Sequence, residues 1–100
     1  MQLTPLQLVT VVAEAFLEHR LVRDVEAAGA RGWTVTEARG RGTRHVRATE
    51  FEGSHLRLET LVSPEVAERL LEVFARDYFP HYAVVAFVSE VQVVRGDKYA

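Results

Sequence analysis

The chain has 100 residues, enough for one domain with a single hydrophobic core and too few for two. Hydrophobic residues make up 48% of it, in runs that favour a globular core and are too short to cross a membrane. The chain has no cysteine, which excludes disulfides and thiolate chemistry, and its net charge of −2 gives no general attraction to nucleic acid or anionic lipid.

The first half of the chain contains two strand patterns and one helix pattern. Residues 6–13 are rich in β-branched side chains and too short for a typical helix, which predicts a buried strand. Over residues 16–28 apolar positions recur every three or four residues, which predicts an amphipathic helix followed by Gly29 in a left-handed conformation. Residues 33–39 alternate apolar side chains with threonines and predict a second strand.

The second half repeats this order of elements. Residues 55–62 alternate again, which predicts a third strand with Leu56 and Leu58 on one face. The segment 63–65 is typical of a helix start, with serine as the N-cap and proline in the first turn. A Phe-Pro-His sequence at 79–81 ends that helix, and the apolar run 83–94 predicts the last strand.

These elements predict an α+β fold, a ferredoxin-like βαββαβ sandwich with a four-stranded antiparallel sheet and both helices on one face. The whole chain, residues 1–100, then forms one domain. Apolar side chains on the strands exceed what two short helices cover, which favours a homo-oligomer that packs sheet against sheet. The alternative is that they stay partly exposed at the sheet edges. The residues concerned are Val9, Val11, Val35, Leu61, Val85, Phe87, Val91 and Val93.

A basic segment joins the two halves. It contains four arginines and two glycines: Arg39, Gly40, Arg41, Gly42, Arg44 and Arg47. Glycines directly after a strand allow a sharp turn and a close approach to a ligand. Arg44 and Arg47 carry planar guanidinium groups suited to phosphate, and the Thr43 hydroxyl is a further donor. The alternative is a solvated basic loop that is balanced by Glu50 and Glu52.

Two stretches of this region resemble a known family. Residues 32–42, GWTVTEARGRG, resemble the G-[aromatic or Met]-T-V-T-E-x-x-G-x-G stretch of the nitrogen-regulatory PII signalling proteins. Residues 42–47, GTRHVR, are similar to the G-S-R-N-V-R element of the PII-like proteins that accompany bicarbonate transporters and carboxysomes. The strand order and the ending VVRG at 93–96 agree, so the resemblance covers nearly the whole chain.

The resemblance implies a homotrimer that binds adenine nucleotides in clefts between subunits and that signals rather than catalyses. Gly32, Trp33 and Thr34 are then expected beside the adenine, and Arg44 and Arg47 match the phosphate-gripping arginines of the PII-like branch. The resemblance places Gly40, Gly42, Leu61 and the Arg95-Gly96 ending on another side of the cleft, and Arg41 stands where that branch has a lysine. Thr43 is included because its hydroxyl can complete the shell around the phosphate. The candidate site residues are Gly32, Trp33, Thr34, Gly40, Arg41, Gly42, Thr43, Arg44, Arg47, Leu61, Arg95 and Gly96.

The sequence departs from the family in two places that bear on the ligand. The connecting loop, a short T-loop at about residues 41–54, contains no tyrosine, so uridylylation of a loop tyrosine is not expected. Residues 78–82 replace the glycine-rich turn that holds polyphosphate in true PII proteins, which favours AMP, ADP or cyclic AMP over ATP. No tightly bound cofactor is expected, and bicarbonate stays a candidate ligand beside Arg44 or Arg47.

Other functions remain as alternatives. A small ferredoxin-like enzyme acting on a phosphorylated or anionic metabolite would use Glu37, His45 and the arginines. RNA binding ranks last because the strands lack paired exposed aromatics. No histidine pair has the spacing of a zinc motif, so no metal is expected. We expect a cytoplasmic protein without membrane insertion, since the N-terminus lacks the basic start of a signal peptide. The family resemblance implies that it regulates a partner such as a membrane transporter.

Overall fold

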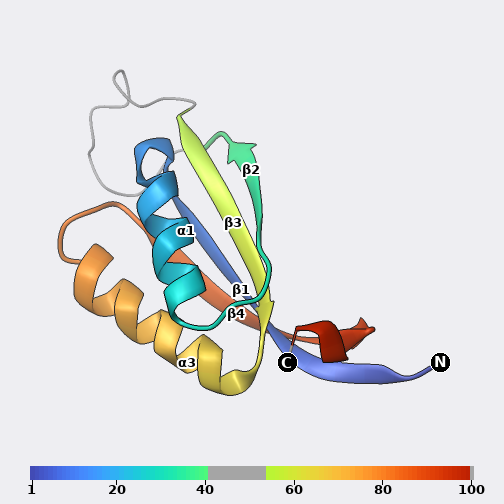
Figure 1. The fold of residues 1–100 in the computed structure, drawn as a ribbon. Helices are drawn as coiled ribbons and strands as arrows, with labels where there is room; N and C mark the ends of the chain where they lie inside the picture. The colour runs from blue at the N-terminus through green and yellow to red at the C-terminus, as the bar shows by residue number, and fades with distance from the viewer. Residues whose placement is uncertain (41–53, 100) are drawn as a thin grey trace.

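A computed structural model describes residues 1–40 and 54–99, which form an antiparallel sheet with two helices on one face (Figure 1). The sheet order is β2-β3-β1-β4, which confirms the predicted ferredoxin-like arrangement. The elements in chain order are β1 (Leu3–Glu14), a 3₁₀ turn (Ala15–Leu17), α1 (Glu18–Ala27), β2 (Thr34–Ala38), β3 (His55–Val62), α3 (Pro64–Val73), a π-helical turn (Phe74–Tyr78), β4 (Val85–Val94) and a second 3₁₀ turn (Gly96–Lys98).

The register of the two central strands decides which side chains face the helices. Val11 in β1 lies opposite Leu58 in β3 and opposite Ala86 in β4. Residues directly opposite one another share a face of the sheet, so these three side chains point the same way. Val11 and Leu58 are fully buried, and Ala86 packs against the same core. This face is therefore the one that the helices cover.

Both helices form where the sequence predicts them, with differences at one end of each: residues 15–17 form a 3₁₀ turn before α1, and residues 74–78 continue α3 as a π-helical turn up to the predicted break. The stripe of α1 and its flanks is buried, with Leu21 and Val25 fully removed from solvent, and Gly29 follows with a φ of 111°. Ser63 Oγ accepts a hydrogen bond from the Val66 amide at 3.3 Å and caps α3. Each helix is thus fixed by its termini as well as by its apolar stripe.

The uncovered face of the sheet carries apolar side chains that lie opposite one another across β1 and β4. Val85 is 54% exposed and Phe87 is 43% exposed. Leu61, Val91 and Val93 lie on the same face by register. A sheet face of this kind is a surface that an assembly can bury.

The sequence-based assignment of apolar surplus was wrong for three residues. Val9 and Val11 are fully buried beneath the helices, and Val35 packs against the same core. The error has a physical cause: residues 8–12 of β1 are apolar or β-branched at every position, so alternation does not separate the two faces.

The first strand also begins earlier than predicted, at Leu3 rather than at residue 6. It pairs with β4 from Leu3 onward but with β3 only from Gln7. Pro5 lacks an N–H and therefore sits where β1 has one neighbouring strand instead of two. Figure 1 shows this two-stranded arm reaching away from the helices, with both chain ends beside it.

Candidate functional site

Six of the predicted site residues lie toward one end of the sheet, which we call the turn end. Residues 32–34 and Leu61 lie where β2 begins and β3 ends, and Arg95 and Gly96 lie further along, at the end of the arm that β4 forms with β1. The Thr60 hydroxyl donates a 2.6 Å hydrogen bond to the Gly32 carbonyl and ties the turn before β2 to β3. A Cβ built on Gly32 would lie 3.7 Å from Cε1 of Tyr99, so the C-terminal turn reaches the same place.

The backbone after β4 is unusual at two consecutive residues. Arg95 has a φ of 62° and a ψ of 33°, a left-handed conformation that non-glycine residues seldom adopt. Gly96 is buried against Thr4, and a Cβ there would lie 2.5 Å from the Thr4 Cβ. The Tyr99 amide then donates to the Gly96 carbonyl at 3.0 Å. These contacts hold the tyrosine ring near Gly32.

Trp33 lies between α1 and β2 and keeps part of its ring in solvent. Its side chain is 39% exposed, and the indole Nε1 donates to Glu26 Oε2 at 3.0 Å. The next residue, Thr34, is exposed on the uncovered face of the sheet opposite Glu59. Leu61 is half-buried opposite Leu8 in β1. Residues 32–34, predicted beside the adenine, thus lie next to the end of β3 that carries Leu61, which was predicted on another side of the cleft.

The opposite end of β2 is the connector end, where residues 41–53 leave the sheet and return. Ala38 at the end of β2 pairs with His55 at the start of β3, and the Ala15 amide donates to the Ser54 carbonyl at 2.9 Å. Gly40 lies here, and a Cβ on it would meet no described atom within 4 Å. The predicted residues Arg41, Gly42, Thr43, Arg44 and Arg47, and His45 of the enzyme alternative, lie outside the described residues.

The two ends are far apart within one chain. At about 3.3 Å per residue, the eight residue steps from Gly32 to Gly40 correspond to roughly 25 Å. A mononucleotide does not bridge that distance along one strand. One chain therefore does not bring Gly32 and Gly40 into one pocket.

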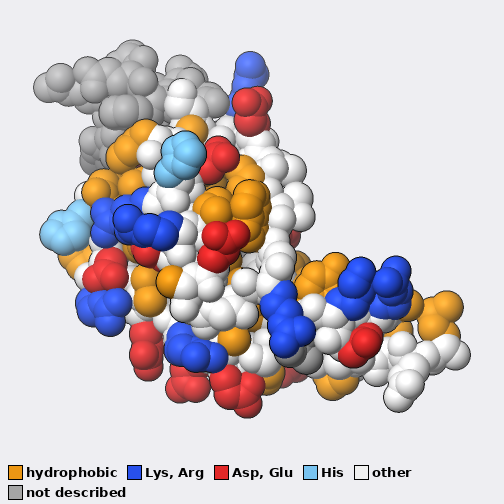
Figure 2. Space-filling model, in the orientation of Figure 1, with side chains coloured by type: hydrophobic (Ala, Val, Ile, Leu, Met, Phe, Trp, Pro, Cys, Tyr) orange, Lys and Arg blue, Asp and Glu red, His pale blue; other side chains and the backbone are white. Residues whose placement is uncertain are grey.

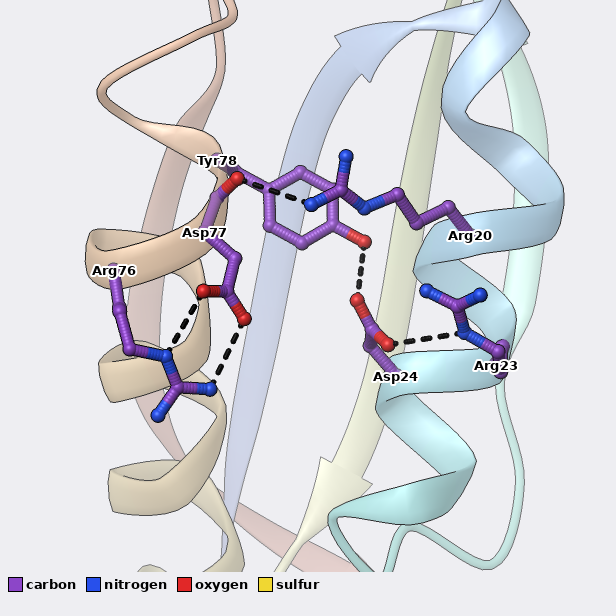
Figure 3. Close-up of polar contacts among 6 residues, drawn as sticks. All are labelled: Arg20, Arg23, Asp24, Arg76, Asp77 and Tyr78. Carbon is purple, nitrogen blue, oxygen red and sulfur yellow. Dashed lines mark hydrogen bonds and ion pairs between the residues drawn. The ribbon is translucent and has the colours of Figure 1, made fainter.

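A polar cluster that the sequence analysis did not identify joins the two helices (Figure 3). Tyr78 is fully buried, and its hydroxyl donates to Asp24 Oδ2 at 2.6 Å. The Arg20 guanidinium lies 4.6 Å from the centre of the Tyr78 ring and donates to the Asp77 carbonyl at 3.2 Å. Burial first, and then the hydrogen bond to Asp24, raise the pKa of Tyr78 above its ordinary value.

The same arginine holds the segment between α3 and β4. Arg20 Nη1 donates to the Tyr82 hydroxyl at 3.1 Å, and Phe16 packs edge-on against the Tyr82 ring with a centroid distance of 5.9 Å. The Tyr82 side chain is thus engaged inside the chain, whereas Phe79 of the same segment is 41% exposed. In the sequence, only the four-residue spacing of Tyr78 and Tyr82 indicated that the two side chains share a face. Nothing local indicated their partner Arg20, which is 62 residues from Tyr82.

Charged side chains of both signs are interspersed over the helices on the face that Figure 2 shows. Arg76 and Asp77 form one such pair, with Nε and Oδ1 2.9 Å apart, and the arginine lowers the pKa of Asp77. Within the described part of the chain, no helix is long and apolar enough to span a membrane.

The described residues define a ferredoxin-like α+β fold whose candidate ligand residues fall at two ends of the sheet. The sequence also matches the family described as nitrogen regulatory protein P-II over residues 6–98. The chain therefore belongs to the P-II family and is a PII-like signalling protein, a class of regulatory proteins. This confirms the predicted family.

Three solved structures show the range of this likeness. A PII-like signalling protein from Thermus thermophilus is 56% identical over 100% of both chains, with a TM-score of 0.87. CPII from Thiomonas intermedia K12, bound to ADP, AMP and bicarbonate, is 25% identical over 94% of this chain and 98% of its own, with a TM-score of 0.82. The B. subtilis GlnK–ATP complex shares the fold at 18% identity, with coverages of 87% and 82% and a TM-score of 0.65.

Proposed function

We propose that the chain is a single PII-like domain that assembles as a homotrimer and binds AMP, ADP or cyclic AMP in the clefts between its subunits. Binding alters the surface around residues 41–53, which a partner such as a membrane transporter reads. The protein acts as a regulator and catalyses no reaction. The distance between the two ends of β2 is the observation that carries this proposal.

The separation of the two ends favours a site made by two chains. The turn end offers aromatic rings and the left-handed Arg95, whereas the connector end leads into the segment with Arg44 and Arg47. A nucleotide needs contacts to its base and to its phosphate at the same time. Gly32 and Gly40 lie roughly 25 Å apart along one chain. A neighbouring chain that brings its connector end to the turn end would supply both contacts to one nucleotide.

The uncovered face of the sheet supports the assembly. Phe87 and Val85 expose their side chains there, and burying such apolar surface between chains is favourable. Arg57 and Glu59 lie on the same face, with Nη2 and Oε2 3.4 Å apart, and the Arg57 guanidinium lies 5.9 Å from the Phe87 ring centre. This ion pair gives the contact between copies a preferred register.

The choice of a mono- or diphosphate follows from the phosphate-binding groups. Arg44 and Arg47 supply two guanidinium groups, which suit one or two phosphates and also a small anion such as bicarbonate. CPII was solved with ADP, AMP and bicarbonate. In the present chain the amides of Phe79, His81 and Tyr82 already donate to backbone carbonyls, so the segment after α3 does not offer these amides to a third phosphate in the manner of a glycine-rich turn.

Calorimetric titration with AMP, ADP, ATP and cyclic AMP tests the proposal. At least one of the first two should bind below millimolar, and ATP should bind more weakly. Arg47→Ala should weaken AMP binding about tenfold or more, because a charge-assisted hydrogen bond contributes roughly 1.5–3 kcal/mol. Arg69→Ala, an exposed arginine on α3, is the matched control and should leave the affinity unchanged. The proposal is wrong if no adenine nucleotide binds below millimolar.

A further inference from the structure

Trp33, the single tryptophan of the chain, is hydrogen-bonded through its indole N–H and remains partly exposed to solvent. Trp33 Nε1 donates to the Glu26 carboxylate at 3.0 Å, and 39% of the residue is still exposed. Glu26 belongs to the last turn of α1, a helix that the core fixes through Val25. The carboxylate therefore ties the indole to a rigid element, and the nitrogen needs no partner from a ligand.

The neighbourhood of Trp33 is equally well determined. The Thr60 hydroxyl fixes the Gly32 carbonyl at 2.6 Å, and the Tyr99 ring comes within 3.7 Å of the position that a Gly32 Cβ would take. Gly32 thus has one aromatic residue next to it in sequence and another next to it in space. Aromatic side chains beside a glycine, which has no side chain of its own, form a surface on which a planar aromatic base can stack.

We infer that Glu26 is a positioning residue for the nucleotide: it orients Trp33 so that the indole ring, with Tyr99 nearby, contacts the adenine base. This inference rests on the proposed function and assigns the base contact to a particular side chain and its support. A side chain that is already held in its bound orientation loses little rotational freedom when the ligand arrives, so preorganisation raises affinity. Glu26 acts through its acceptor oxygen and needs no contact with the nucleotide.

If Glu26 acts as a hydrogen-bond acceptor, Glu26→Ala and Glu26→Gln should have different effects on AMP binding. Glu26→Ala removes the acceptor, whereas Glu26→Gln keeps an amide oxygen in nearly the same place. The alanine variant should weaken AMP binding about three- to tenfold, the range expected for the loss of one hydrogen bond. The glutamine variant should stay within about twofold of wild type on the same scale. Glu68→Ala, an exposed acid on α3, controls for the change in net charge.

Fluorescence of Trp33 gives a readout that requires no ligand, since the chain has one tryptophan. Acrylamide should quench Glu26→Ala more strongly than wild type or Glu26→Gln, because the released indole moves more freely. AMP should change the emission of wild type. In a Trp33→Phe background, which has no indole N–H, adding Glu26→Ala should change the affinity for AMP by less than about twofold.

The results separate this inference from the function on which it rests. If wild type binds AMP and Glu26→Ala binds it equally well, the positioning role is refuted and the proposed function stands. The same holds if Glu26→Ala weakens AMP binding equally in the Trp33→Phe background. If wild type binds no adenine nucleotide, the titration of wild type alone refutes both.

Discussion

The two ends of the sheet differ in how the chain fixes them. At the turn end, contacts from distant parts of the sequence meet: Thr60 bonds to Gly32, and Gly96 packs on Thr4. At the connector end, the described contacts are backbone pairing: His55 of β3 lies opposite both Ala38 of β2 and Glu14 of β1, and the Ala15 amide donates to the Ser54 carbonyl. One end provides a shaped surface with aromatic rings, and the other leads to the arginines.

This difference suggests a division of labour within one nucleotide site. Shape recognition of a base needs preorganised rings, which distant contacts can supply. Phosphate recognition needs charge and hydrogen-bond donors, which a short arginine-rich segment supplies. Under the proposed function a neighbouring chain completes the site, so the proposal makes assembly a condition for binding.

The largest expected effect comes from breaking the assembly. Phe87→Lys places a second cation beside Arg57 on the uncovered face, where a buried unpaired charge is costly. We expect loss of the trimer by light scattering and, with it, loss of AMP binding. Leu71→Lys changes an exposed apolar residue of α3 and should keep both. A monomeric Phe87→Lys protein that binds AMP normally would show that one chain holds a complete site.

A second substitution changes the helical layer and spares both ends of the sheet. Tyr78→Phe removes the hydroxyl that donates to Asp24 and should lower the free energy of unfolding by about 1.5–3 kcal/mol. AMP affinity of the folded protein should not change. Urea unfolding and calorimetry measure the two quantities, and a loss of affinity would mean that the helical layer takes part in the site.

The same tyrosine predicts an alkaline pH dependence. Burial and Asp24 raise its pKa in the folded state, so folding favours the neutral phenol. That stabilisation is complete below the ordinary tyrosine pKa of about 10 and is lost as the pH rises above it. Unfolding free energy should therefore fall above about pH 10 in wild type and fall less in Tyr78→Phe. Tyr82→Phe retains Tyr78 and should show the wild-type slope.

The smallest expected effect is a difference in stability between alanine substitutions of Gly96, at the turn end, and Gly40, at the connector end. Gly96→Ala forces a methyl group to within 2.5 Å of the Thr4 Cβ and should destabilise the protein by about 1–2 kcal/mol, as overpacking does. It should also weaken AMP binding, because Tyr99 follows that turn. Gly40→Ala meets no described atom within 4 Å and should change stability by less than about 1 kcal/mol. Equal losses of stability in thermal unfolding would contradict the contrast between the ends.

Sequence periodicity predicted those elements in which one face is polar. The bounds of β3 were predicted without error because its apolar and charged residues alternate, and the stripe of α1 is buried as expected. In β1 every position from 8 to 12 suits the interior, and Val9 and Val11 were therefore counted as surplus. Pro5 concealed the start of that strand because proline usually ends one.

Prediction of the site was limited by contacts between residues far apart in sequence. The motif at residues 32–42 identified Gly32 and Trp33, but it gave no indication that Glu26 accepts the indole proton or that Tyr99 reaches Gly32. The Arg20 cluster was missed for the same reason, since its tyrosines come from the other end of the chain. Local patterns identify residues, whereas only the fold identifies their partners.

The most direct test of a site shared between chains mixes two defective proteins. Trp33→Ala damages the turn end and Arg47→Ala damages the connector end, so each alone should bind AMP at least about tenfold more weakly than wild type and show no site of wild-type affinity. After unfolding and refolding the two together, about a quarter of the clefts should combine an intact turn end with an intact connector end, by random assembly. Calorimetry should then detect AMP binding of wild-type affinity at about that fraction of the wild-type stoichiometry. Trimers that mix the two chains and still show no site of wild-type affinity would contradict the shared site.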